Sequence, residues 1–147
     1  MLDITTKTFN QLSLNELYYV LQLRSEVFVV EQDCVYQDVD GKDHKALHVI
    51  GKKNDIIIAY TRIFKPGDYF KEASIGRVVV SQKERHLKYG HQLMKASILA
   101  TEDAFGIKEI KISAQKYLEQ FYNNLGFKTI GESYLEDGIP HIAMVKN

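Results

Sequence analysis

The feature that most constrains the fold is a strand–turn–helix segment in the middle of the chain. Residues Ala73 to Ser81 include Val78-Val79-Val80, and such an apolar run predicts a strand buried on both faces. A charged turn, Gln82 to Lys88, follows the strand, and the spacing of apolar residues then predicts a helix from Tyr89 or Gly90 to about Phe105. This segment gives the chain a mixed α and β character.

Apolar spacing and turn residues divide the rest of the chain into further strands and helices. Ser13 and Glu16 form a capping-box pattern, which predicts the start of a helix over Leu14–Phe28, and the polar stretch Glu31–Lys45 is interpreted as a loop. Strands are also expected at Thr5–Phe9, Ala46–Lys52, Ile56–Phe64, Ile107–Ala114, Phe127–Tyr134 and Pro140–Val145, with a short helix at Tyr117–Leu125. Because no linker or repeat interrupts this order, we predict one α+β domain spanning residues 1–147.

Charge and cysteine content narrow the classes of partner. The 147 residues carry 19 basic and 19 acidic side chains, so the chain lacks the basic excess of a typical nucleic-acid-binding protein. Cys34 is the single cysteine, which excludes an intramolecular disulfide and fits a reducing compartment. No apolar run is long enough to span a membrane, and the first residues lack an apolar secretory signal. We therefore expect a cytoplasmic protein with neither nucleic acid nor membrane as a partner.

The turn between the central strand and helix has the chemistry of an anion site. Backbone N–H groups at the start of a helix have no partner within the helix, and the helix dipole favours negative charge there. Lys83, Arg85 and Lys88 add positive charge, and Gly90 allows a ligand to approach the backbone closely. These residues favour a phosphate-bearing ligand, with a plain connection carrying solvated charges as the alternative. The segment matches neither a P-loop nor a dinucleotide-binding fingerprint.

The same turn, Arg85-His86-Leu87-Lys88-Tyr89-Gly90, resembles the coenzyme A motif Gln/Arg-x-x-Gly-x-Gly/Ala of the GNAT acetyltransferase superfamily. Lys88 stands where the first glycine of the motif is usual, so a backbone with positive φ there would be strained. Downstream, the stretch from Gln115 through Phe121-Tyr122 to Gly126-Phe127 is similar to a second family pattern, with Gln115 in place of asparagine.

Further segments resemble one branch of the superfamily, the ElaA-like proteins. They are Arg24, Val27 to Gln32, Cys34, Tyr36, Asp40, Asp43 and His48 near the N-terminus, and Glu136 to His141 near the C-terminus. The resemblance therefore covers nearly the whole chain in the order of the family.

The resemblance implies a fold and a cosubstrate. The fold is a GNAT-like three-layer arrangement, with flanking helices on a mixed, mostly antiparallel sheet whose fourth and fifth strands splay apart. The cosubstrate is acetyl-coenzyme A, with no metal, and the acceptor is a primary amine of a small molecule or peptide; family members often form homodimers. The residues that the resemblance places on the cosubstrate are Val78, Val79, Val80, Arg85, His86, Leu87, Lys88, Tyr89, Gly90, His91, Gln115 and Tyr122.

The implied reaction is direct transfer of the acetyl group to the amine, and it needs a proton donor and a proton acceptor. Tyr122 matches the tyrosine that the family uses as general acid towards the leaving thiolate; a core aromatic is the alternative reading. The central strand carries no carboxylate that could act as general base. The candidates are Glu31, Glu72, His48 and His141, and a water chain is a further alternative.

The sequence also permits other interpretations of the function and of several residues. A coenzyme A binding or sensing module without catalysis is the main alternative function. Asp38, Asp40, Asp43, His44 and His48 are close enough in sequence for a metal-binding loop, although their spacing fails the EF-hand pattern. Cys34 is either a nucleophile or an inert thiol. Arg24 and Arg77 each require a partner, which is an internal carboxylate or an acidic group of the acceptor.

Overall fold

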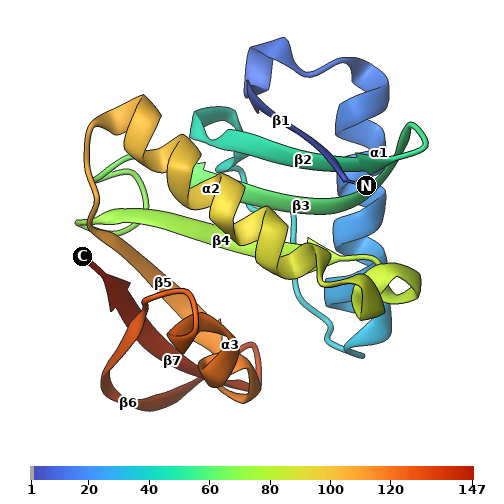
Figure 1. Cartoon of the computed structure of the whole chain (residues 1–147). Helices are drawn as coiled ribbons and strands as arrows, with labels where there is room; N and C mark the ends of the chain where they lie inside the picture. Colours follow the sequence, from blue (N-terminus) through green and yellow to red (C-terminus); the bar gives the residue numbers. More distant parts are fainter. Residues whose placement is uncertain (1) are drawn as a thin grey trace.

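The computed structural model describes residues 2–147 and is built on one seven-stranded sheet with the order β1-β2-β3-β4-β5-β7-β6 (Figure 1). Neighbouring strands are antiparallel except β4 and β5, which run parallel. The strands are β1 (Asp3–Thr8), β2 (Leu47–Lys53), β3 (Ile56–Phe64), β4 (Ala73–Val80), β5 (Ile110–Gln115), β6 (Lys128–Glu136) and β7 (Ile139–Lys146). The expected mixed and mostly antiparallel sheet is thereby confirmed.

Helices cover both faces of this sheet. They are α1 (Leu14–Arg24), α2 (Tyr89–Phe105) and α3 (Glu119–Asn123), with a π-helical segment η2 (Ser25–Glu31) and 3-10 segments η1 (Phe9–Gln11), η3 (Asp43–Lys45), η4 (Gln82–Leu87) and η5 (Lys116–Leu118). In Figure 1, α2 lies across β2, β3 and β4, and α1 lies behind them. Neighbouring residues of β2, such as Val49 and Ile50, pack against opposite layers because strand side chains alternate between faces. The expected three-layer arrangement follows from this alternation.

The first helix is longer than the sequence predicts. The α-helix ends at Arg24, and the chain continues as η2 to Glu31, which was expected to begin a loop. The amide of Cys34 donates to the carbonyl of Val29, and the amide of Gln32 donates to the carbonyl of Val27. Each bond spans one residue more than in an α-helix, a geometry that is frequent at functional sites.

The prediction that β4 is buried on both faces is wrong for its middle. Ala73 to Ile75 are buried, whereas Gly76 to Val78 are partly exposed. Across the sheet, Arg62 pairs with Gly76 and Tyr60 pairs with Val79, so β4 has one extra residue, a β-bulge, opposite β3. Within the bulge Arg77 adopts a φ of 49°.

The parallel strands β4 and β5 separate soon after they meet. Within residues 2–147 their pairing is limited to Ala73 with Ile110 and Ser74 with Lys111. Beyond these pairs β5 follows β7 up to Gln115, and β4 leads into η4 and α2. Figure 1 shows the two strands diverging. The expected splay of the fourth and fifth strands is confirmed, and it leaves backbone N–H and C=O groups of both edges without a strand partner.

The strand and short helix that follow α2 begin later than expected. The strand predicted from Ile107 starts at Ile110, and the helix predicted over Tyr117–Leu125 is the turn η5 followed by α3. In the described part of the chain, no helix combines the length and the apolar character needed to cross a bilayer.

Candidate active site

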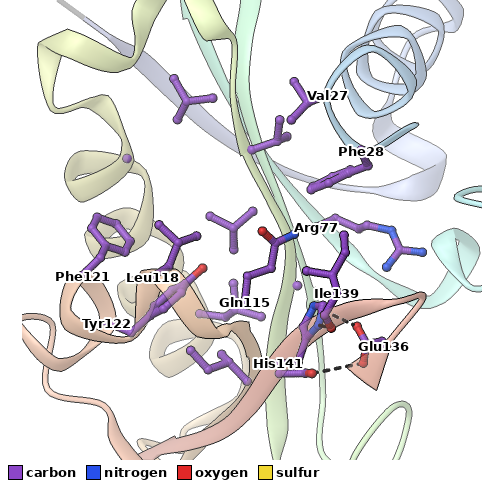
Figure 2. Close-up of a pocket in the computed structure, with 18 of the residues that line it drawn as sticks. Val27, Phe28, Arg77, Gln115, Leu118, Phe121, Tyr122, Glu136, Ile139 and His141 are labelled. Atoms are coloured by element: carbon purple, nitrogen blue, oxygen red, sulfur yellow. Dashed lines mark hydrogen bonds and ion pairs between the residues drawn. The ribbon is translucent and has the colours of Figure 1, made fainter. Parts of the chain in front are cut away.

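A cavity of about 860 Å³ occupies the gap between β4 and β5. It runs from the start of α2, where Lys88 and Gly90 line it, past Val78 to Val80, to the turn between β6 and β7. Figure 2 shows Tyr122 and Phe121 on one side of this space and His141 and Glu136 at its lower end. The cavity therefore brings together residues from both halves of the sequence.

One end of the cavity is the start of α2. No side chain within residues 2–147 caps this helix, and its first turn carries no acidic residue. The first backbone N–H groups of α2 therefore keep their positive potential for a ligand. The side chains of Lys88 and His91 line the same end. The uncapped helix start expected from the sequence is present, and the binding of an anion there stays a prediction.

The backbone of Lys88 has the positive φ that the usual glycine of the motif would adopt most easily. Its φ of 60° and ψ of 24° are left-handed, so the backbone at this point does need the conformation that glycine adopts most easily. This conformation destabilises the fold by roughly 1 kcal/mol relative to a residue that adopts it without strain. Lys88 lines the cavity beside the helix start, and its side chain is exposed.

Arg85 spans the mouth of this end. Its Nε donates to the carbonyl of Val80 at 3.0 Å, and its Nη2 donates to Oε1 of Glu31 at 2.8 Å. Glu31, one of the four candidate bases, is thus paired with a guanidinium near the end of the cavity where α2 starts. This bridge ties the end of η2 to the end of β4.

Some of the expected cosubstrate residues lie outside the cavity lining. The side chains of His86 and Leu87 are exposed on η4, and that of Tyr89 is buried beneath it in the core. Gln115 does line the cavity, where its side-chain amide pairs reciprocally with that of Gln32 at 3.2 and 3.3 Å. This pair joins β5 to the end of η2 across the gap.

Tyr122 lies at the wall of the cavity between α3 and the strands. It is 4% exposed, and its ring packs edge-on against Phe121 and Phe127. Figure 2 shows its hydroxyl turned into the cavity. Burial, with a smaller contribution from Tyr117, raises the pKa of Tyr122 well above its usual value of 10.0. The side chain is therefore both a core aromatic and a protonated donor at neutral pH.

Two of the candidate bases, Glu72 and His48, lie outside the cavity lining. Glu72 precedes β4 and does not line the cavity. His48 is 1% exposed inside the core, where its Nε2 lies 2.9 Å from the carbonyl of Asp43 and its Nδ1 lies 2.6 Å from the hydroxyl of Tyr60. Burial lowers the pKa of His48. The ring is neutral, and both of its nitrogens are occupied.

His141 is the candidate base that lies in the right place. It lines the cavity from β7 and is 6% exposed. Its Nδ1 lies 2.7 Å from the carbonyl of Ile139, which accepts only, so Nδ1 carries the proton and Nε2 of the neutral ring has the lone pair. That Nε2 lies 3.4 Å from Oε2 of Glu136, as the dashed line in Figure 2 marks. The pair has the form of a base with a carboxylate that stabilises its protonated state.

Glu136 has no role predicted from the sequence, although it lies within a segment that carries the family resemblance. Ser113 on β5 donates to its Oε1 at 3.1 Å. The carboxylate is therefore oriented from β5 and β7 together. Only the register of these strands, which places Gln115 opposite His141, brings the three residues to one point.

The acidic loop after η2 is a salt-bridge network. Oδ1 of Asp43 accepts from Arg24 at 2.8 Å and from Arg62 at 2.9 Å, and both arginines are 1% exposed. Asp40 pairs with Arg62 at 2.6 Å, and Asp38 pairs with Arg24 at 2.9 Å.

Arg77 joins this network from the bulge of β4. Its Nε lies 2.7 Å from Oδ1 of Asp38, an ion-pair distance at an angle unsuited to a hydrogen bond. The hypothesis that Arg24 and Arg77 pair with internal carboxylates is confirmed. The carboxylates of the acidic loop are held by arginines, and the described residues contain no cluster of His, Cys, Asp and Glu arranged for a metal.

Cys34 fastens this loop to the turn between β6 and β7. The thiol donates to the carbonyl of Asp137 at 3.3 Å, and the side chain is 9% exposed at the cavity edge. Its contact is with a backbone carbonyl, which cannot activate a thiol by accepting its proton. The structure therefore favours a structural role over nucleophilic catalysis.

Comparisons with known proteins agree with this geometry. A profile of the acetyltransferase (GNAT) domain matches residues 8–147. Protein ElaA of Escherichia coli K12 is 45% identical over 139 residues, which cover 93% of this chain and 91% of ElaA. The crystal structures of Escherichia coli ElaA and of an acyl-CoA N-acyltransferase from Pseudomonas aeruginosa each superpose with a TM-score of 0.93 at 42% identity, over 100% of both chains. The chain therefore belongs to the GNAT acetyltransferase family, as a homologue of ElaA.

Proposed function

We propose that this protein transfers an acetyl group from acetyl-coenzyme A directly to a primary amine of a small molecule or peptide. The observation that carries the proposal is the gap between β4 and β5, where unpaired strand edges face a cavity that ends at an uncapped helix start. An extended chain with amide groups, such as the pantetheine arm, pairs with such edges as an added strand does. A diphosphate suits the helix start.

The donor end supplies charge as well as backbone. The amides of the first turn of α2 and the ammonium of Lys88 bind the diphosphate, while Arg85 and Glu31 close the mouth beside it. Val78 to Val80 offer backbone groups along the cavity wall. Because the sequence of the turn leaves room at Gly90, the phosphate approaches the helix amides closely.

The proposal assigns backbone amides at the bulge of β4 to the negative charge that develops on the thioester oxygen. An extra residue in a strand leaves an amide outside the ladder, and Gly76 to Val78 line the cavity at this point. Amides fixed in this way stabilise an oxyanion, a contribution that mutagenesis elsewhere puts at about 3–4 kcal/mol for one donor.

Two side chains handle the protons. His141 takes a proton from the ammonium form of the acceptor, which gives the nitrogen its lone pair. The nitrogen attacks the thioester carbon, the carbon–sulfur bond breaks, and Tyr122 gives its proton to the leaving sulfur. The second proton that the nitrogen loses restores Tyr122. The overall change is therefore one amide and one thiol formed, with one proton released.

A thiol-release assay tests this proposal. Purified protein is mixed with acetyl-coenzyme A and a panel of primary amines, and free thiol is measured against time. Wild-type protein should release thiol only when an accepted amine is present. Tyr122→Phe should lower turnover by about 10²- to 10⁴-fold while calorimetry shows unchanged coenzyme A binding.

Binding without thiol release for any amine would favour the alternative, a coenzyme A binding or sensing module. An unchanged rate for Tyr122→Phe would remove this tyrosine from the mechanism while leaving the donor site intact.

A further inference from the structure

The cavity extends past Tyr122 to residues of the C-terminal strands, and this end of it is called the acceptor compartment. Its lining includes Ser113, Glu136 and His141 from β5, β6 and β7, together with Tyr36 and Tyr69. This compartment is where the acceptor must lie, because His141 and Tyr122 border it from either side. Its charges therefore select the acceptor.

The cations beside this compartment are already neutralised. Arg62 and Arg77 line it, but Arg62 is paired with Asp40 and Asp43, and Arg77 is paired with Asp38. An arginine held by buried carboxylates has little attraction left for a carboxylate of the acceptor. A carboxylate on the acceptor would lie near the carboxylates of the acidic loop, and negative charges that lie close together repel each other.

Glu136 has the opposite character. Its side chain is 44% exposed, its Oε1 accepts from the neutral Ser113 hydroxyl, and its Oε2 faces His141, which is neutral when Nε2 holds a lone pair. No lysine or arginine of the described residues pairs with it. Glu136 therefore places an uncompensated negative charge next to His141, and the neighbouring Asp137, which also lines the cavity, has no ion-pair partner among the described residues.

The walls of the compartment are largely aromatic. The rings of Phe64 and Tyr69 stack at 5.2 Å, Phe70 packs edge-on against Tyr69 at 4.8 Å, and Tyr36 lies under the guanidinium of Arg77. Aromatic walls bury apolar surface of a ligand, and a small number of polar groups then fix its orientation.

We propose that this compartment is a subsite for a primary amine carried on an apolar chain, with no carboxylate on the carbon that bears the nitrogen. The proposal rests on the acyltransferase function above and names its acceptor class. Glu136 binds the incoming ammonium group beside His141. His141 accepts one proton at Nε2 and passes it to solvent, and the carboxylate of Glu136 stabilises the protonated ring meanwhile. The aromatic walls hold the hydrocarbon part.

Matched pairs of acceptors test the proposal. Phenethylamine and tyramine differ from phenylalanine and tyrosine by the α-carboxylate alone. With acetyl-coenzyme A in saturating amount, kcat/KM for each amine should exceed that of its amino acid by about 10- to 100-fold. Equal or better use of the amino acids would overturn the proposal while leaving the acetyltransferase function standing.

Variants on one strand connect the preference to Glu136. Glu136→Gln should raise KM for phenethylamine by about tenfold and narrow the gap between amine and amino acid. Glu132→Gln is the control, because Glu132 lies on β6 as well but is exposed and outside the cavity lining. A preference that Glu136→Gln leaves unchanged contradicts the assignment.

A direct binding measurement keeps the test independent of turnover. Calorimetry of phenethylamine against protein saturated with coenzyme A should give a Kd at least about tenfold below that of phenylalanine, and Glu136→Gln should remove this difference. The amine should bind even if the rate of transfer is too low to follow. Failure of coenzyme A itself to bind would count against the proposed function, whereas equal Kd values for amine and amino acid would count against the subsite alone.

Discussion

Gly90 offers a substitution in which stability and ligand binding should change in opposite directions. It lies in the first turn of α2 without a positive φ, and a Cβ built there would meet Cζ of Phe121 at 3.6 Å and Cγ2 of Val80 at 4.0 Å. Both are ordinary van der Waals distances, so the fold accepts an alanine. Because alanine loses less backbone entropy than glycine in a helix, Gly90→Ala should stabilise the protein by about 0.5–1 kcal/mol. For a domain of this size, that raises Tm by about 1 to 4 °C.

The same methyl group lies at the end of the cavity proposed for the diphosphate, because Gly90 lines that end. It keeps phosphate oxygens away from the first amides of α2, and the loss of charge-assisted hydrogen bonds is worth about 1.5–3 kcal/mol. Coenzyme A affinity should therefore fall by roughly 10- to 100-fold. Thermal unfolding of the free protein gives the first quantity, and isothermal titration calorimetry gives the second.

Gln92→Ala serves as the control, since Gln92 is exposed on the same helix and its change should leave the coenzyme A affinity unaltered. A higher Tm for Gly90→Ala with an unchanged Kd would refute the placement of the phosphate at this helix start. A lower Tm would show instead that Gly90 is required for packing.

Three further outcomes follow from the same contacts. Lys88→Gly and Lys88→Asn both tolerate the left-handed backbone, so each should keep the free energy of unfolding within about 1 kcal/mol of the wild-type value. Each should nevertheless weaken coenzyme A binding several-fold. Calorimetric Kd values equal to that of the wild type would exclude an ammonium–phosphate contact. Asp43→Asn leaves buried arginine charge uncompensated and should lower the unfolding free energy by about 3–5 kcal/mol in urea titrations, whereas Asp33→Asn on the exposed loop should change it by less than about 0.5 kcal/mol. Stability should also fall in acid. Burial lowers the pKa of His48, so below its unfolded value of 6.5 the unfolded chain binds more protons than the folded one. Burial raises the pKa of Glu16, but contacts with Lys7, Ser13 and Lys52 outweigh this effect and hold the pKa at about 2 instead of 4.5. The contribution of Glu16 to the free energy of unfolding is therefore lost as the pH falls from 4.5 towards 2. Equal free energies of unfolding at pH values near 7 and 3 would contradict both assignments.

The order of strands and helices could be predicted from the sequence because each element carries its own periodicity or cap. Ser13 and Glu16 do form a capping box, with the Glu16 amide donating to Ser13 Oγ at 3.0 Å. The bulge in β4 could not be predicted in this way, because Arg77, which takes the positive φ, is not a residue that signals such a conformation. The helix predicted to end at Phe28 becomes π-helical after Arg24 and runs to Glu31, and the residues from Ser25 to Glu31 carry no local signal for that change.

The candidate site also has a part that the sequence predicts and a part that it does not. The turn at Gly90 and the helix with Tyr122 are local motifs, and their positions at the cavity follow from sequence patterns that the family shares. The meeting of His141 with Glu136 and Ser113 depends on the register of β5, β6 and β7, which apolar alternation alone does not fix. The sequence offered four candidate bases without a way to separate them, and burial and hydrogen bonding separate them in the folded chain.

The central claim is that the gap between β4 and β5 binds coenzyme A with the diphosphate on the first turn of α2. Calorimetric titration of the wild-type protein with acetyl-coenzyme A tests it most directly. The account predicts a saturable isotherm with one site for each chain. Absence of binding by both acetyl-coenzyme A and free coenzyme A would contradict the claim, and the proposed reaction would fall with it.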